Sequence, residues 1–174
     1  REVILSGEAY FDVVKDKSAP FIVRTELGNI EVLGTEFNIK CYSDETALVT
    51  TLVNGKVKFD DGINPSVILK PEEQLIFEKE NSQSIVRKVN VNHYISWKDN
   101  RLSFQGETLD MIMKTLSRWY NVEVVFEDST LKALEFSGNL DRFTDIQEFL
   151  SLFELGVNVK FEVKNRTVYI RKGN

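Results

Sequence analysis

Residues 1–90 alternate apolar and polar side chains in short runs. Ala9, Phe11 and Val13 share one face of a run, and Phe21 and Val23 share one face of the next. This alternation is typical of half-buried strands, and Gly, Asn, Asp and Pro residues separate many of the runs. The region therefore predicts about ten short strands and no helix, which means an all-β sandwich, a jelly roll or a short coil of sheets.

Asn54-Gly55 is the strongest turn signal in this region. Both residues tolerate positive φ, which a two-residue type I′ hairpin turn requires. Residues 47–53 before the pair and residues 56–59 after it both have strand character. We therefore expect these two strands to form a hairpin.

Further along the chain the apolar spacing becomes helical. Leu109, Ile112, Met113 and Leu116 recur three or four positions apart, which predicts an amphipathic helix. A strand is expected to follow at residues 122–127.

A second helix is predicted to begin at Thr144. Thr-Asp-Ile-Gln has the form of a capping box there, with Gln147 at the third helical position. Gly156 stands where a glycine just past the helix would end it. Strands at 157–163 and 167–172 close the chain.

The two helices and the strands after them repeat in one register. Asn121 and Asn158 begin matching Asn-Val phrases, and the same separation relates four apolar positions of the helices. The matched pairs are Leu109 with Ile146, Ile112 with Phe149, Met113 with Leu150, and Leu116 with Phe153. This gapless repeat predicts two strand–helix–strand units, whose first strands are 101–104 and 134–140. We expect the two helices to pack on one face of a small sheet, as an α+β domain.

The change of pattern predicts two domains: an all-β domain at 1–92 and a smaller α+β domain at 99–174, with a linker at 93–98. A chain of 174 residues is long enough for both. It opens inside a predicted strand without an initiator methionine, and it has no signal peptide and no apolar run of about 20 residues. We therefore expect it to be a piece of a longer protein.

Charge and residue types exclude several functions. A net charge of −5 is unfavourable for a nucleic-acid partner and gives no reason to expect contact with an anionic membrane. The one histidine, His93, has no cysteine or acid at metal-ligand spacing, and Cys41 alternates onto the buried face of a strand. The acidic pairs at 44–45, 60–61 and 72–73 fall in predicted turns or strand starts. The sequence therefore predicts no catalytic, cofactor-binding or metal-ligating residue, and no enzyme.

Two leucines indicate a contact surface. Leu152 and Leu155 fall on the side of the second helix opposite its apolar stripe. They form a surface for a partner, or they pack on the β domain or make the usual apolar contact at a helix end. The last strand, with Val168, Tyr169 and Ile170, is a candidate open sheet edge for a partner strand. These five residues are the predicted docking surface.

Several motifs resemble the periplasmic region of the FecR-type anti-sigma factors, as found in Bacteroidetes. Within residues 7–45 they are Gly-Glu-Ala-Tyr-Phe, Pro-Phe-Ile-Val and Val-Leu-Gly-Thr-x-Phe-Asn, in that order. Residues 50–57 and 69–75 continue the pattern. Residues 96–128 and 136–142 look like the C-terminal segment of the family, which is similar to the small signalling domain of secretins and TonB-dependent transducers.

The resemblance implies the periplasmic portion of a single-pass inner-membrane anti-sigma factor, whose membrane span and cytoplasmic part would precede residue 1. The signalling domain of a TonB-dependent outer-membrane transporter would contact this portion, and the missing cytoplasmic part would pass the signal to an extracytoplasmic-function sigma factor. Such a role requires a partner surface and a change of state, and no cofactor. The alternative is a periplasmic polysaccharide-binding β module with an accessory α+β domain, for which Trp97 and Trp119 are the candidate sugar platform.

The resemblance also places Gly34-Thr35 where some regulators of this type cleave themselves. The threonine hydroxyl would attack the glycine carbonyl, which requires a strained peptide and a group that hydrolyses the resulting ester. The alternative is a tight turn in which Gly34 supplies backbone freedom.

Overall fold

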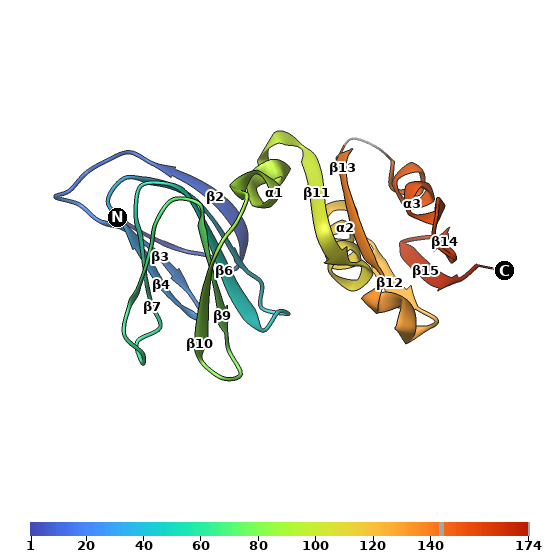
Figure 1. Cartoon of the computed structure of the whole chain (residues 1–174), viewed down its shortest axis with the longest axis horizontal. Coiled ribbons are helices and arrows are strands. Elements are labelled where there is room, and N and C mark those ends of the chain that lie inside the picture. Colours follow the sequence, from blue (N-terminus) through green and yellow to red (C-terminus); the bar gives the residue numbers. More distant parts are fainter. Residues whose placement is uncertain (143–144, 174) are drawn as a thin grey trace. The chain divides into compact units, whose positions relative to one another are not determined.

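The computed structural model describes residues 1–142 and 145–173 and divides the chain into two compact units, Arg1–Ile95 and Ser96–Asn174 (Figure 1). The boundary falls within the segment 93–98. This segment is helical rather than extended, because the α-helix α1 (Val91–Ile95) runs directly into the 3₁₀ helix η1 (Ser96–Asp99).

The N-terminal unit contains two five-stranded sheets, which confirms the all-β prediction. In spatial order, the first sheet contains β1 (Glu2–Ile4), β3 (Phe21–Thr25), β4 (Gly28–Val32), β7 (Val57–Asp60) and β8 (Val67–Leu69). The second contains β10 (Gln83–Lys88), β9 (Glu73–Glu78), β6 (Ala47–Asn54), β5 (Thr35–Cys41) and β2 (Gly7–Val13). Both sheets contribute to one apolar core, which makes the unit a β sandwich.

Alternation along the strands builds this core. Val23 and Ile30 of the first sheet and Phe37 and Leu52 of the second are fully buried. Burying each such side chain stabilises the fold by about 1.5–3 kcal/mol. Cys41 is also buried in this core, as predicted, and burial raises the pKa of its thiol.

The expected hairpin at Asn54-Gly55 is wrong. β6 pairs with β5 and β9, whereas β7 pairs with β4 and β8, so the turn joins strands of different sheets. The backbone at Gly55 has φ +97° and passes close to the backbone at Gly34. A Cβ added to Gly55 would lie 2.7 Å from the Gly34 carbonyl oxygen. The Asn-Gly pair therefore makes a corner between the sheets, because the positive φ of Gly55 suits a tight corner as well as a hairpin.

The C-terminal unit contains the two predicted strand–helix–strand units and a final strand. Its elements are β11 (Arg101–Thr108), α2 (Leu109–Tyr120), β12 (Glu123–Phe126), the 3₁₀ helix η2 (Ser129–Ala133), β13 (Glu135–Asp141), α3 (Ile146–Glu154), β14 (Val159–Lys164) and β15 (Thr167–Lys172). This arrangement confirms the α+β class.

The strands of this unit form two sheets, so the expectation of one small sheet is wrong. The two first strands pair with each other as β11-β13, and the other three form a sheet in the order β12-β15-β14. Both sheets and both helices contribute to a single core. The repeat in the sequence indicates which side chains face that core, but it does not indicate which strands pair with each other.

The ends of both helices carry capping residues, but Gln147 is the second residue of α3 and not the third, as the predicted capping box required. Thr108 caps α2 by accepting a hydrogen bond from the Met111 N–H. Asp145 caps α3 by accepting one from the Gln147 N–H at 2.8 Å, and Thr144, the predicted start, lies outside the described residues. Gly156 has φ +101° just past α3, as its predicted role requires.

An ion pair connects the end of β15 to the start of η2. The Asp128 carboxylate accepts hydrogen bonds from the Thr130 N–H at 2.9 Å and the Thr130 hydroxyl at 2.6 Å, and it lies 2.8 Å from the Lys172 ammonium. The bond from Lys172, followed by those from Thr130, lowers the pKa of Asp128 from its usual 3.8 to about 2.

We expect this carboxylate to make the C-terminal unit acid-sensitive over a defined window. The pKa of Asp128 is lower in the folded chain than in the unfolded chain. The stability that the Asp128 carboxylate contributes is therefore present above pH 3.8 and is lost as the pH falls through about 2. Trp97 and Trp119 both lie in this unit, so tryptophan fluorescence reports its thermal unfolding. When the pH is lowered from about 4 to about 2, the unfolding temperature of Asp128→Asn is expected to fall less than that of the unchanged chain. An equal fall in both proteins would contradict this prediction.

Candidate partner-docking surface

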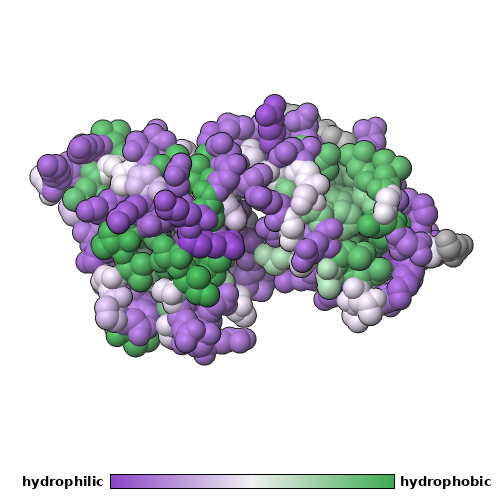
Figure 2. Space-filling model, in the orientation of Figure 1, coloured by the Kyte–Doolittle hydropathy of each residue, from purple (hydrophilic) through white to green (hydrophobic). Residues whose placement is uncertain are grey.

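α3 presents an apolar stripe to the core and two leucines to solvent. Phe149, Leu150 and Phe153 are buried, whereas Leu152 is 43% exposed and Leu155 is 77% exposed. Apolar residues come to the surface of this unit on the face that Figure 2 shows. Helical spacing therefore placed Leu152 correctly outside the core. Leu155 is also exposed, but it is the C-terminal cap of α3 and lies just past the last helical residue. The docking role of both leucines remains a prediction.

The final strand is not the open edge that we expected. β15 is the central strand of its sheet and pairs with β12 on one side and β14 on the other. Val168 and Ile170 are fully buried, and Tyr169 is half-buried. This part of the predicted docking surface is wrong, because a strand bonded on both sides has no backbone groups left for a partner.

The edge beside α3 is β14, and α3 already occupies part of it. The Glu154 carboxylate accepts a hydrogen bond from the Phe161 N–H at 2.9 Å and another from the Lys160 ammonium at 2.6 Å. The bond from Lys160 is the main cause that lowers the pKa of Glu154. A shallow groove of about 220 Å³ lies between Leu150 of the helix and Val163 of the strand. A partner strand would have to displace Glu154, so the two leucines are the more accessible contacts.

Gly34 and Thr35 lie at the start of β5 in a tightly packed corner. Gly34 has φ +142°, and an added Cβ would lie 2.6 Å from the Lys15 Cβ. Thr35 is buried; its hydroxyl donates to the Lys56 carbonyl oxygen at 3.0 Å and accepts from the Lys56 N–H at 3.4 Å. Self-cleavage would require this hydroxyl to leave Lys56, whereas the turn role accounts for the glycine directly.

The other candidates have ordinary surroundings. The Arg142 guanidinium lies 4.4 Å from the centroid of the Trp119 ring, and Trp119 also packs against the core, so the ring is not an open sugar platform. Within residues 1–142 and 145–173 there is no group of three or more His, Cys, Asp or Glu side chains that could hold a metal ion. In the same residues no helix is long and apolar enough to cross a membrane.

The sequence did not predict a groove in the N-terminal unit, on the outer side of the first sheet. It has a volume of about 530 Å³ and is lined by Lys15, Lys17, Glu31, Val32, Leu33, Gly34, Thr35, Gly55, Lys56, Lys58 and Ile68. The available signal was the repeated Lys-x-Lys pattern at 15–17 and 56–58. Nothing in the sequence indicated that the two pairs meet.

The chain is thus a two-unit protein: a β sandwich is followed by a double strand–helix–strand domain with exposed leucines. Two family models match the chain. The model for the FecR protein matches residues 1–58, and the model for the FecR C-terminal region matches residues 101–170. The chain belongs to the FecR family.

Solved structures agree with this assignment. Two crystal structures of a protein assigned as an anti-sigma factor from Parabacteroides distasonis ATCC 8503, at 1.65 Å and 2.50 Å resolution, superpose with TM-scores of 0.89 and 0.88. Each is 25% identical to this chain and covers 100% of it, and the match spans 81% of the solved chain. Among curated protein sequences, none matches the chain.

Proposed function

We propose that this chain is the periplasmic portion of a transmembrane anti-sigma factor. It receives a signal by contact with a TonB-dependent outer-membrane transducer and relays it across the inner membrane to an extracytoplasmic-function sigma factor. The observation that carries the proposal is the match of both units to FecR family models. Its similarity over its whole length to a protein assigned as an anti-sigma factor supports the same role.

In this proposal the C-terminal unit is the receptor, and Leu152 and Leu155 are its contacts. Leu155 is mostly exposed to water, and Leu152 is nearly half exposed. Burial against a partner would contribute about 1.5–3 kcal/mol for each leucine. Two apolar side chains at the C-terminal end of α3 can therefore supply much of the affinity of a small interface.

We expect Leu152→Asp combined with Leu155→Asp to weaken binding of the transducer signalling domain at least about a hundredfold, because both apolar contacts are lost and charge enters the interface. The measurement is calorimetry or pull-down with the purified signalling domain of the transporter encoded nearest to this gene. The matched control combines Ile63→Asp and Val125→Asp, whose side chains are 80% and 41% exposed.

Circular dichroism should show both double variants to be folded. If the unchanged chain does not bind the signalling domain, the proposed function fails. If the leucine variant binds as well as the control does, the function stands but this surface is wrong.

A further inference from the structure

The groove in the N-terminal unit gathers positive charge on a chain that is acidic as a whole. Four of its lining residues are lysines and one is a glutamate, although the chain carries a net charge of −5. Lys58 lies 3.7 Å from Glu31, both of them partly exposed. Among residues 1–142 and 145–173, Lys15, Lys17 and Lys56 have no ion-pair partner. At least three of the lysines that line the groove therefore form no ion pair within the described part of the chain.

The backbone holds these lysines in place. The loop that contains Lys15 and Lys17 is bonded to the end of the first sheet, where the Asp16 N–H donates to the Leu33 carbonyl oxygen at 2.8 Å. The Asp16 carboxylate accepts hydrogen bonds from the Ser18 N–H and hydroxyl, at 2.9 and 2.7 Å. It is therefore bonded within its own turn and not to a lysine of the groove.

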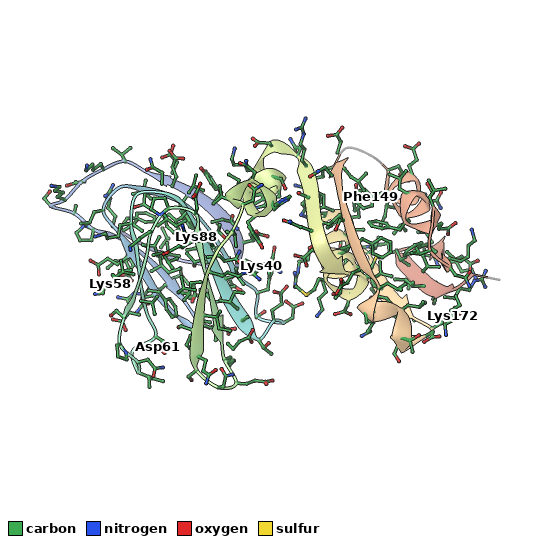
Figure 3. All side chains as sticks on the ribbon, viewed as in Figure 1. Lys40, Lys58, Asp61, Lys88, Phe149 and Lys172 are labelled. Atoms are coloured by element: carbon green, nitrogen blue, oxygen red, sulfur yellow. The ribbon has the colours of Figure 1, made fainter. Side chains whose placement is uncertain are left out.

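The other two lysines come from the corner between the sheets. Lys56 is held by both of its backbone bonds to the Thr35 hydroxyl, and Lys58 belongs to β7. Figure 3 places Lys58 on the side of the sandwich away from Lys40 of the second sheet. Because hydrogen bonds or strand pairing hold the backbone at Asp16, Lys56 and Lys58, little conformational entropy beyond that of the side chains is lost there when an anion binds.

The groove is also apolar. Leu33 is 42% exposed and Ile68, on the edge strand β8, is 48% exposed, and both line it together with the buried Val32. Across the sheet, Ile68 is paired with Lys58, and Lys58 with Glu31, so an apolar side chain lies beside charged ones on this outer face. A ligand that matches the groove must present carboxylates beside a large apolar side chain.

We propose that this groove binds an acidic segment of a partner protein, with carboxylates at Lys15, Lys17 and Lys56 and an apolar side chain against Leu33 and Ile68. Its volume of about 530 Å³ suits a short segment. A membrane or a nucleic acid would meet a wide surface, where the net negative charge of the chain opposes binding. The site goes beyond the proposed function, because it is a second contact on a different unit.

The test uses fluorescence anisotropy with a labelled hexapeptide that alternates glutamate and leucine, and a matched peptide with glutamine in place of glutamate. The acidic peptide should bind more tightly, and more so at low ionic strength. Lys15→Glu combined with Lys56→Glu should weaken its binding about tenfold or more, because two attractions become repulsions. The control, Lys79→Glu combined with Lys88→Glu, changes the net charge equally on two exposed lysines outside the groove and should bind as the unchanged chain does.

Three results would overturn the proposal: no binding of the acidic peptide, an equal loss in both double variants, or equal binding of the glutamine peptide. Sedimentation with phosphatidylglycerol vesicles tests the membrane alternative. Vesicle binding that depends on Lys15 and Lys56, without peptide binding, would replace the proposal with that alternative. The variant with Leu152→Asp and Leu155→Asp should keep full peptide binding, which separates this site from the docking surface on α3.

Discussion

Replacing Phe153 by alanine is expected to lower the free energy of unfolding of the C-terminal unit by about 3–5 kcal/mol. Phe153 is 5% exposed and belongs to α3. Its ring centroid lies 4.9–6.4 Å from four other rings, those of Phe104, Phe136, Phe149 and Phe161. These rings come from β11, β13, α3 and β14, so one side chain joins both sheets of the unit to the helix that carries the docking leucines.

Denaturant titration followed by tryptophan fluorescence measures this loss in the right unit, because Trp97 and Trp119 both belong to it. Phe153→Leu keeps most of the apolar volume and should cost clearly less than alanine does. Leu155→Ala, at the exposed C-terminal cap of the same helix, should change stability by no more than about 0.5 kcal/mol. A Phe153→Ala variant as stable as Leu155→Ala would show that the aromatic cluster is not what holds the unit together.

The sequence predicted the helices of this unit better than its sheets. Helical spacing identified the buried face of α3 at Phe149 and Phe153, and the exposed face at Leu152 and Leu155, because a helix satisfies its own backbone bonds and its faces follow from spacing alone. A strand needs a neighbour. The pattern of β15 was read correctly as a strand, but alternation carries no information about whether it has one neighbour or two.

The same limit explains the corner at Asn54-Gly55. The local turn chemistry was recognised, but whether the chain turns back beside itself or crosses to a second sheet depends on the packing of the whole sandwich. The lysine groove was missed for a related reason. Its charges come from a loop after β2 and from the start of β7, which are far apart in the sequence and meet only because Gly34 and Gly55 let the backbones approach closely.

Replacing Gly34 by alanine is expected to destabilise the N-terminal unit strongly. The residue has φ +142°, which an L side chain rarely adopts, and the new Cβ would press against the backbone and side chain of Lys15. Backbone strain of this kind costs about 1–3 kcal/mol, and overpacking adds about 1–3 kcal/mol. Gly62→Ala is the matched control, because Gly62 has φ +76° but nothing within 4 Å of an added Cβ, so only the backbone strain remains.

The single cysteine of the chain provides the measurement. Cys41 is 1% exposed in the core of the N-terminal unit, so a thiol reagent reaches it mainly when that unit opens. A loss of about 3 kcal/mol should raise its labelling rate about a hundredfold in Gly34→Ala, and the rise in Gly62→Ala should be clearly smaller. Equal rates in Gly34→Ala and the unchanged chain would mean that the corner relaxes without cost.

A change at Thr35 separates the two possible roles of the Gly34-Thr35 bond. If the bond forms only a turn, mass spectrometry of the freshly purified chain shows one intact species, and Thr35→Val changes only stability, by about 1–3 kcal/mol, because the Lys56 N–H and carbonyl lose their partner. If the Thr35 hydroxyl attacks the Gly34 carbonyl, two fragments appear in the unchanged chain and vanish in Thr35→Val. Because that hydroxyl is buried and bonded to Lys56 in both directions, we expect the intact species.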